Sequence, residues 1–438
     1  MTNGQHAIQH NNASQFNKRS LTWSLMQRAD DPDVARANQQ LKTDIAKGAN
    51  GVAIIFEGSH NAFGFGLPAK NDTIEKLFDG ISLDGLHIRL DNHPHGSALT
   101  QTLVDFLYKR HVSHTQTKLT FSIDPAASLA TTGQLKMSIA AMKASLPQSL
   151  SVFFSSGLPG IVLEADGRPY HNAGATPAQE LGAMLSIAVG HLRMIEEARH
   201  HIAYALPHIG FATALDQFPI EGLAKIRAIR LLWRRYQEQR KVPSPVSATI
   251  HVESSMRMME TGEVMSNITR TSLACYAAII GGAASVCLLP HTMALGLPDK
   301  EARQIALNTK LIMAYEGTHS VAKHPNRRAA DAESLAEAAW EEFERLEKEG
   351  GIIQSLIDGK FNKRIEEARD IALADYLKGE QFLIGFDQNP GEHVDVIKAS
   401  PSSYTMEGIK YCEPLVLGRW QQELLDALQS APIEPKKA

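Results

Sequence analysis

Short apolar runs that alternate with longer amphipathic segments limit what this chain can fold into more than any other feature of its sequence. Seven runs have strand character and are almost continuously apolar, at residues 51–58, 86–91, 118–124, 161–166, 208–215, 248–254 and 285–291. Such runs are typical of parallel strands that are buried on both faces. With an eighth strand expected near 317–323, the alternation predicts an α/β protein with a (β/α)8 TIM barrel.

The segments between these runs have helical patterns. The clearest are 177–198, which starts at Pro177, and 218–239 and 263–280, all with apolar residues at helical spacing. Two more helices are expected after the last run, at 299–316 and 333–349, and the second ends at a Gly-Gly pair, a typical helix stop.

A doubly wound open sheet is the competing fold. It would need a glycine-rich phosphate-binding turn after the first strand, followed directly by a helix. Gly64 and Gly66 lie in that region, but the third glycine and the helix are missing, so the barrel is the better prediction. The barrel is expected to span 19–378, after a disordered N-terminal arm at 1–18 and before a short C-terminal extension at 379–438.

The composition excludes several classes of partner. Lys and Arg number 44 against 48 Asp and Glu, a net charge of −4, so no bulk electrostatic attraction favours nucleic acid or an anionic membrane. No apolar run is long enough to span a membrane, and the polar N-terminus lacks the features of a secretory signal. The three cysteines are too few for a disulfide framework or a zinc site, and Cys275 and Cys287 are expected as buried thiols. We therefore expect a cytoplasmic protein.

Candidate site residues lie just past the predicted strand ends, where barrel enzymes place their chemistry. They are His60, Asp91, His93, Asp124, His171, Asp216, Ser255, Arg257 and His291. His171, expected at the carboxyl end of the fourth strand, has the chemistry of a general acid or of an electrostatic clamp on a carbonyl oxygen. A structural histidine bonded to backbone is the alternative. Arg257 suits a carboxylate or phosphate, or a rim salt bridge with Glu260 or Glu263.

The stretch DNHPHG, residues 91–96, matches the pattern D-x-H-x-x-G by which cobalamin-binding domains supply a histidine to cobalt. Asp91, His93 and Gly96 are its fixed positions. The serine and Gly-Gly signals that normally follow are missing, and the strand before it already belongs to the barrel. Two histidines and one aspartate also make a weak metal site. We interpret the motif as a decoy and expect no metal site.

From residue 161 onward the chain resembles the methylmalonyl-CoA mutase family of cobalamin-dependent isomerases. The resemblance covers roughly half the chain, and its motifs occur in the family's order. It implies that the chain is the family's acyl-CoA barrel, which is the fold that the alternation of strands and helices also predicts. It is carried by RPYHNAGATPAQEL, LAKIRAIRLLW, NITRTSLACYAAIIGGA, ALGLPD with the residues through Asn308-Thr309, and AWEEFERLEKEGGI.

Departures from the family's pattern concern the catalytic residues. The Tyr-Asp-Ser-Asp stretch after the first strand is replaced by AFGFGLPAKND, and Thr-x-Gln-Asn-Asp after the third strand by FSIDPAAS. The turn with the reactive histidine reads YHNAGA and is two residues shorter, which is expected to displace His171. KHPNRRAADAE replaces a Gly-Gly-Ser segment, and the cobalamin domain is expected to be absent after PLVLGRWQQELL.

The resemblance is therefore greatest to the small (beta) subunit of heterodimeric mutases. It implies a chain whose own active site is degenerate, in an isomerase (an intramolecular transferase) that interconverts methylmalonyl-CoA and succinyl-CoA. A large catalytic partner subunit would hold adenosylcobalamin, which this chain would not bind, and His171 would be vestigial. In the alternative, this barrel binds an acyl-CoA, with His171 at the carbonyl and Arg257 on the acyl group, and a separate cobalamin-binding protein completes it. A repurposed barrel, with unrelated chemistry or cobalamin bound through His93, is the third hypothesis.

Overall fold

The computed structural model describes residues 21–112, 117–155, 160–316, 329–386 and 394–430. Eight parallel strands form a closed barrel, which confirms the predicted fold class. The last strand pairs with the first, with Ser24 opposite Ser285, and this pairing closes the barrel. In chain order the barrel strands are β1 (Ser24–Ala29), β2 (Gly51–Ile54), β3 (His87–Leu90), β4 (Lys118–Ile123), β6 (Ile161–Asp166), β7 (Ile209–Leu215), β8 (Thr249–Ser254) and β9 (Ser285–Cys287).

The strand that the sequence did not reveal is β1. Its sequence, SLMQRA, contains Gln27 and Arg28, so it lacks the continuous apolar run by which the other strands were predicted. The barrel closes with β1 as its eighth strand, and the strand expected near 317–323 lies outside the described residues, as does the start of KHPNRRAADAE. One consequence is a correction: His171 follows the fifth barrel strand in the chain, β6, and not the fourth.

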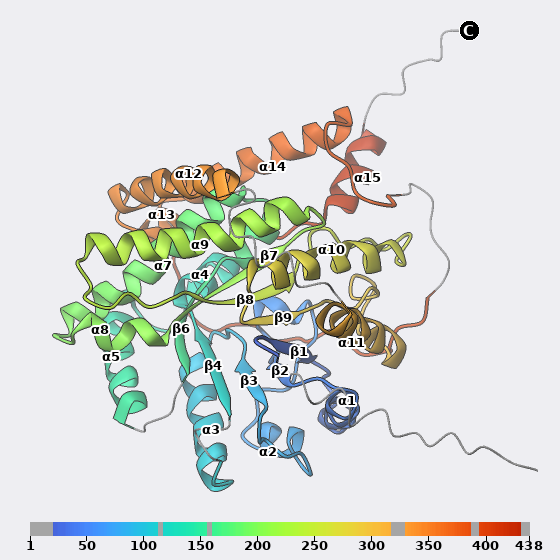
Figure 1. The fold of residues 1–438 in the computed structure, drawn as a ribbon, viewed down its shortest axis with the longest axis horizontal. Coiled ribbons are helices and arrows are strands. Elements are labelled where there is room, and N and C mark those ends of the chain that lie inside the picture. Colours follow the sequence, from blue (N-terminus) through green and yellow to red (C-terminus); the bar gives the residue numbers. More distant parts are fainter. Residues whose placement is uncertain (1–20, 113–116, 156–159, 317–328, 387–393, 431–438) are drawn as a thin grey trace, which may run out of the picture.

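Helices cover the outside of the barrel (Figure 1). The three clearest predictions are confirmed as α7 (Pro177–Glu197), α9 (Pro219–Gln239) and α10 (Ser266–Gly281). The remaining helices up to the last barrel crossover are α1 (Val34–Ala46), η2 (His60–Ala62), α2 (Thr73–Leu77), α3 (Gly96–Lys109), α4 (Pro125–Thr132), α5 (Ile139–Ser155), α6 (Arg168–Asn172), α8 (Ile202–Ala205), η3 (Leu206–His208) and α11 (Lys300–Tyr315).

A further helical layer follows the barrel. The helix α12 (Ala329–Lys348) packs against α7 and α9, and α14 (Lys360–Lys378) lies beside it in the same layer, with the short α13 (Ile352–Ile357) between them in the chain (Figure 1). α15 (Trp420–Ser430) packs against α14, and β10 (Ile409–Lys410) pairs antiparallel with β5 (Gln134–Leu135). The C-terminal residues thus return to the barrel. The predicted domain boundaries at 18 and 378 stay predictions.

Two further expectations concern burial. Cys275 and Cys287 are buried free thiols, as predicted, and burial raises the pKa of Cys287 to about 11. Within the ranges that the structure describes, none of the helices is both long and apolar enough to cross a lipid bilayer.

Candidate functional site

Charged side chains fill the interior of the barrel. We call them the interior cluster, and none is more than 3% exposed: Arg28, Asp30, Arg89, Asp91, Glu164, Asp166, Arg168 and Glu253. Arg89 on β3 donates to Glu164 on β6 at 2.8 Å, and Arg28 on β1 donates to Glu253 on β8 at 3.0 Å. Because another strand separates the two members of each pair in the sheet, both pairs cross the interior of the barrel.

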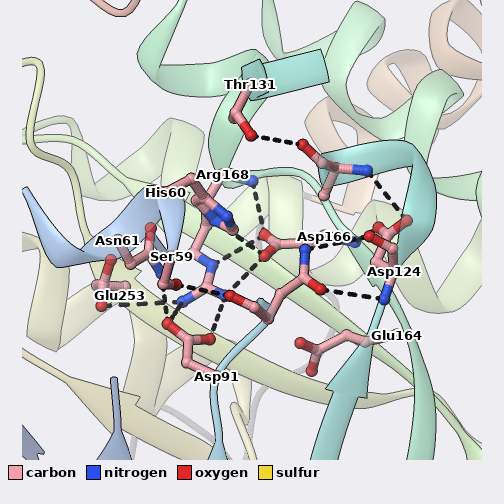
Figure 2. A network of polar contacts seen from close by, with 12 residues as sticks. Ser59, His60, Asn61, Asp91, Asp124, Thr131, Glu164, Asp166, Arg168 and Glu253 are labelled. Carbon is pink, nitrogen blue, oxygen red and sulfur yellow. Dashed lines mark hydrogen bonds and ion pairs between the residues drawn. The ribbon is translucent and has the colours of Figure 1, made fainter. Parts of the chain in front are cut away.

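Arg168 joins the parts of this cluster, as Figure 2 shows. Its guanidinium lies 2.7 Å from Asp91 and 2.7 Å from Asp166, and it also approaches Glu253 at 3.8 Å. His60 is added to the cluster through a 3.2 Å contact between its Nε2 and Asp166 Oδ2. The predicted site residues His60 and Asp91 are therefore part of a buried ion-pair network.

Burial and the neighbouring charges act in opposite directions on the carboxylates of the cluster, and the outcome differs between Asp91 and Glu253. Burial by itself would raise the pKa of Asp91, but the positive charges of Arg168 and Arg89 outweigh burial and hold that pKa well below its usual range. Burial dominates at Glu253 and raises its pKa, although Arg28 and Arg168 oppose the shift. Removing one partner of such a buried pair leaves an uncompensated charge, at a cost of about 3–5 kcal/mol.

Most members of the interior cluster were not predicted from the sequence, although the spacing of the polar residues indicates them. Polar residues recur two positions apart at the strands, where alternate residues share a face, as in Arg28–Asp30, Arg89–Asp91 and Glu164–Asp166. Three such pairs, each beginning within a strand, indicate a barrel with a charged interior.

A second group of polar residues lies at the carboxyl ends of β6, β7 and β8. We call it the His171 cluster; its members are His171, Glu180, Asp216, Lys225, Ser255 and Arg257, and none is more than 8% exposed. His171 Nε2 lies 2.9 Å from Ser255 Oγ and 3.3 Å from Asp216 Oδ1. Its Nδ1 lies 3.2 Å from Glu180 Oε2. The structure thus brings four of the predicted residues together.

Serine, histidine and carboxylate in this order are also the parts of an activated nucleophile. Here the Ser255 side chain has no room to meet a substrate, because the residue is 0% exposed. Lys225 Nζ lies 3.2 Å from His171 Nδ1 and also pairs with Glu180, so the carboxylate is already neutralised by an ammonium group. The contacts therefore fix the imidazole within the protein and leave it inaccessible from solvent.

Arg257 is held by other residues of the chain. Its Nη2 and Nε lie 2.6 and 3.0 Å from Asp216 Oδ2, and its Nη1 donates to the carbonyl of His171 at 2.8 Å and of Ala175 at 3.2 Å. The ion pair of Arg257 with Asp216 is buried, and Glu260 pairs with Arg270, while the alternative rim salt bridge with Glu260 or Glu263 stays a prediction. With four of its N–H groups engaged inside the protein, Arg257 has little capacity for a substrate anion.

His93 and His291 are separate from both clusters, whereas Asp124 Oδ2 accepts from the backbone N–H of Asp166 at 2.9 Å at the edge of the interior cluster. Both ring nitrogens of His93 are engaged: Nε2 lies 2.7 Å from the carbonyl of Glu57, and Nδ1 accepts from the backbone N–H of His95 at 2.9 Å. Asp124 caps α4, and His291 is buried elsewhere at the barrel mouth. No group of three His, Cys, Asp or Glu residues suited to a metal ion occurs among the residues with described positions. This geometry favours the decoy interpretation of DNHPHG, which stays a prediction.

The closed parallel barrel with charged side chains in its interior defines the chain as an α/β barrel protein. A family model for methylmalonyl-CoA mutase matches residues 10–431, and the chain belongs to this family. It is 32% identical over 352 residues to the methylmalonyl-CoA mutase small subunit of Streptomyces virginiae, which covers 78% of this chain and 54% of that protein. The chain thus spans about half the length of this relative.

Similarity extends to both kinds of mutase subunit. The chain is 35% identical over 202 residues to a probable small subunit of Mycobacterium tuberculosis, covering 44% of this chain and 33% of that protein. It is also 30% identical over 272 residues to the large subunit from Streptomyces virginiae, covering 60% of this chain and 37% of that protein.

Proposed function

We propose that this chain is a small-subunit-like, non-catalytic component of an adenosylcobalamin-dependent acyl-CoA mutase of the methylmalonyl-CoA/succinyl-CoA type. It pairs with a large catalytic subunit, which holds the substrate and the cofactor. The charged interior of the barrel is the observation that carries this proposal. The family's acyl-CoA domain is the barrel, and here three arginines and five carboxylates fill that space.

The filled interior argues against an acyl-CoA bound along the barrel axis. A thioester chain would have to separate Arg89 from Glu164 or Arg28 from Glu253, and both pairs are almost fully buried. Each separation would leave charges without partners in a medium of low dielectric constant, at about 3–5 kcal/mol. The pantetheine arm is uncharged, and the single carboxylate of a methylmalonyl or succinyl group cannot replace both members of such a pair. The barrel is therefore a folded support for a partner and not a substrate channel.

The DNHPHG motif, residues 91–96, also lacks a residue that is free to bind the cofactor. Adenosylcobalamin supplies radical chemistry to the family's carbon-skeleton rearrangement, and the protein encloses and orients it. His93 does not fit the role of a cobalt ligand, because both of its ring nitrogens have partners inside the chain and the residue is 3% exposed. No step of the reaction is assigned to this chain.

Reconstitution tests the proposal. The chain is purified alone, with a mutase large subunit from the same source, and with a separate cobalamin-binding protein, each with adenosylcobalamin and methylmalonyl-CoA. We expect succinyl-CoA only when the large subunit is present, together with co-elution of the two chains in size-exclusion chromatography. Turnover by this chain with the cobalamin-binding protein alone would support the alternative and overturn the proposal.

A further inference from the structure

A cleft of about 770 Å³ lies between the barrel and the outer helical layer. Its walls come from residues 174–178 between α6 and α7, from the start of α9, and from α12, α14 and α15. Figure 1 shows α12 and α14 over α9, with α15 beside α14. The volume is that of a site for a small organic ligand. The cleft lies outside the interior cluster, and it is independent of the proposed subunit role.

Aromatic rings form much of the cleft wall. Trp420 is 5% exposed, and Tyr376 packs against it with ring centroids 5.3 Å apart. Phe218 and Phe382 also line the cleft, and Phe382 is 65% exposed, which is unusual for an aromatic side chain. Trp420 already contacts a cation, because the Arg257 guanidinium lies 5.4 Å from its ring centroid. The wall is therefore suited to apolar groups and to organic cations.

Carboxylates give the cleft a negative charge. Its lining has four of them and one guanidinium, a net charge of −3. Asp216 is neutralised by Arg257, whereas Glu221, Asp331 and Glu380 form no ion pair with any side chain in the described part of the protein. Desolvation and the charge of Asp216 raise the pKa of Glu221, and the positive charges of Arg257 and Lys225 oppose this shift only in part.

We infer that the cleft binds a ligand with an ammonium or guanidinium group on an apolar stem. The stem packs against Phe382, Tyr376 and Ile220, and the cation lies near the carboxylates that form no ion pair among the described residues. An anion of the same shape is disfavoured, because Arg257 already has four N–H groups bonded within the protein. A free organic amine, or a lysine or arginine side chain of a bound protein, would supply this chemistry.

Three probes with one stem and different charge test the inference: n-hexylammonium, 1-hexanol and n-hexanoate. Binding is followed by tryptophan fluorescence at pH 7.5, and Trp420→Phe identifies the signal from the cleft. We expect n-hexylammonium to bind at least about tenfold more tightly than 1-hexanol, and n-hexanoate to bind most weakly. Added salt should weaken only the binding of n-hexylammonium. Equal affinity for the ammonium and the alcohol, a preference for hexanoate, or no binding by any probe would overturn the inference.

Variants locate the site. Glu221→Gln combined with Asp331→Asn should weaken n-hexylammonium binding about tenfold and leave 1-hexanol unchanged. Glu366→Gln, an exposed change on α14 outside the cleft lining, is the matched control and should alter neither. A short peptide with one central lysine, compared with its norleucine counterpart, distinguishes a side chain of a bound protein from a free organic amine as the natural ligand. Competition with hexylammonium by the lysine peptide indicates a protein ligand, and binding of hexylammonium without such competition indicates a free amine. An equal loss in the control and the double variant would contradict the assignment to the cleft.

Discussion

At the scale of single residues, His171 is the position where catalytic and structural roles make different predictions. Its ring contacts Ser255, Asp216 and Glu180 inside the protein. His171→Ala should lower the free energy of unfolding by about 1–3 kcal/mol, because buried polar partners lose a hydrogen bond. Turnover of the reconstituted mutase should stay within a few-fold, since the partner holds the reacting atoms. Urea unfolding and steady-state kinetics measure the two effects.

His171→Gln is the control for this experiment, because an amide restores hydrogen bonding without proton transfer near neutral pH. Both variants should leave turnover nearly unchanged, and the glutamine should recover part of the stability. A folded, partner-bound His171→Ala protein with turnover reduced about a hundredfold would assign the histidine to catalysis.

Arg89 tests whether the interior cluster stabilises the barrel. Arg89→Ala leaves Glu164 without its positive partner, whereas Asp91 keeps Arg168, so we expect a loss of about 3–5 kcal/mol in the free energy of unfolding. Arg234→Ala removes an exposed pair with Glu238 and should cost less than about 1 kcal/mol. Similar, small losses in urea unfolding for both variants would show that the interior pairs contribute little.

At the scale of elements, the sequence predicted seven of the eight barrel strands and the long helices α7, α9 and α10. Those elements have long, regular apolar patterns, because they are buried against neighbours along their whole length. The first strand was missed because Gln27 and Arg28 interrupt an apolar pattern that is already short. Arg89 and Glu164 lie in strands that were predicted, but their pairing across the barrel interior was not.

Contacts of the site were harder to predict than its residues. Ser255 is 84 positions from His171 in the chain, and Asp216 is 45 positions away. Their proximity depends on the closed barrel, which places the carboxyl ends of β6, β7 and β8 at one mouth. Strand order alone places these residues at the same end, but the partner of Arg257 depends on loop conformation, which the sequence does not specify.

The start of α7 is the element that follows His171 and orients its turn. Thr176 and Gln179 form a reciprocal capping box, and Pro177 occupies the first turn. Thr176→Ala should lower the free energy of unfolding by about 1 kcal/mol, because the N-cap acceptor is lost. Thr102→Ala within α3 is the control and should be neutral or slightly stabilising. Thermal unfolding of the two variants measures the difference, and equal melting temperatures would contradict the prediction.

At the scale of the whole molecule, buried histidines link stability to pH. Burial lowers the pKa of His87 to about 3 and that of His93 and His191 to about 4, whereas an unfolded histidine titrates at about 6.5. Below that pH the unfolded chain takes up protons that the folded chain does not. Stability should therefore be full above pH of about 6.5 and decrease as the pH falls towards 4, by up to about 1.4 kcal/mol per pH unit for each histidine.

Urea unfolding midpoints at several pH values between 7.5 and 5 measure this dependence. His191→Asn should make the dependence less steep, because one fewer imidazole is protonated on unfolding. Asp124, whose pKa burial raises to about 8, acts in the opposite direction, so the test is the difference between the two proteins. An equal pH dependence in His191→Asn and the unchanged protein would show that His191 is not held neutral in the folded protein.

A supporting subunit differs from a catalytic one in that it does not bind the cofactor. If the large subunit holds adenosylcobalamin, the purified chain should show no cobalamin spectrum with an imidazole-nitrogen ligand, because both nitrogens of His93 are engaged within the chain. Ultraviolet–visible and paramagnetic resonance spectra, recorded for this chain alone and for its complex with the large subunit, provide the measurement. An imidazole signal from the chain alone that disappears in His93→Ala would contradict the prediction. The same signal confined to the complex, and unchanged by His93→Ala, would place the cofactor ligand in the partner and leave this barrel as its support.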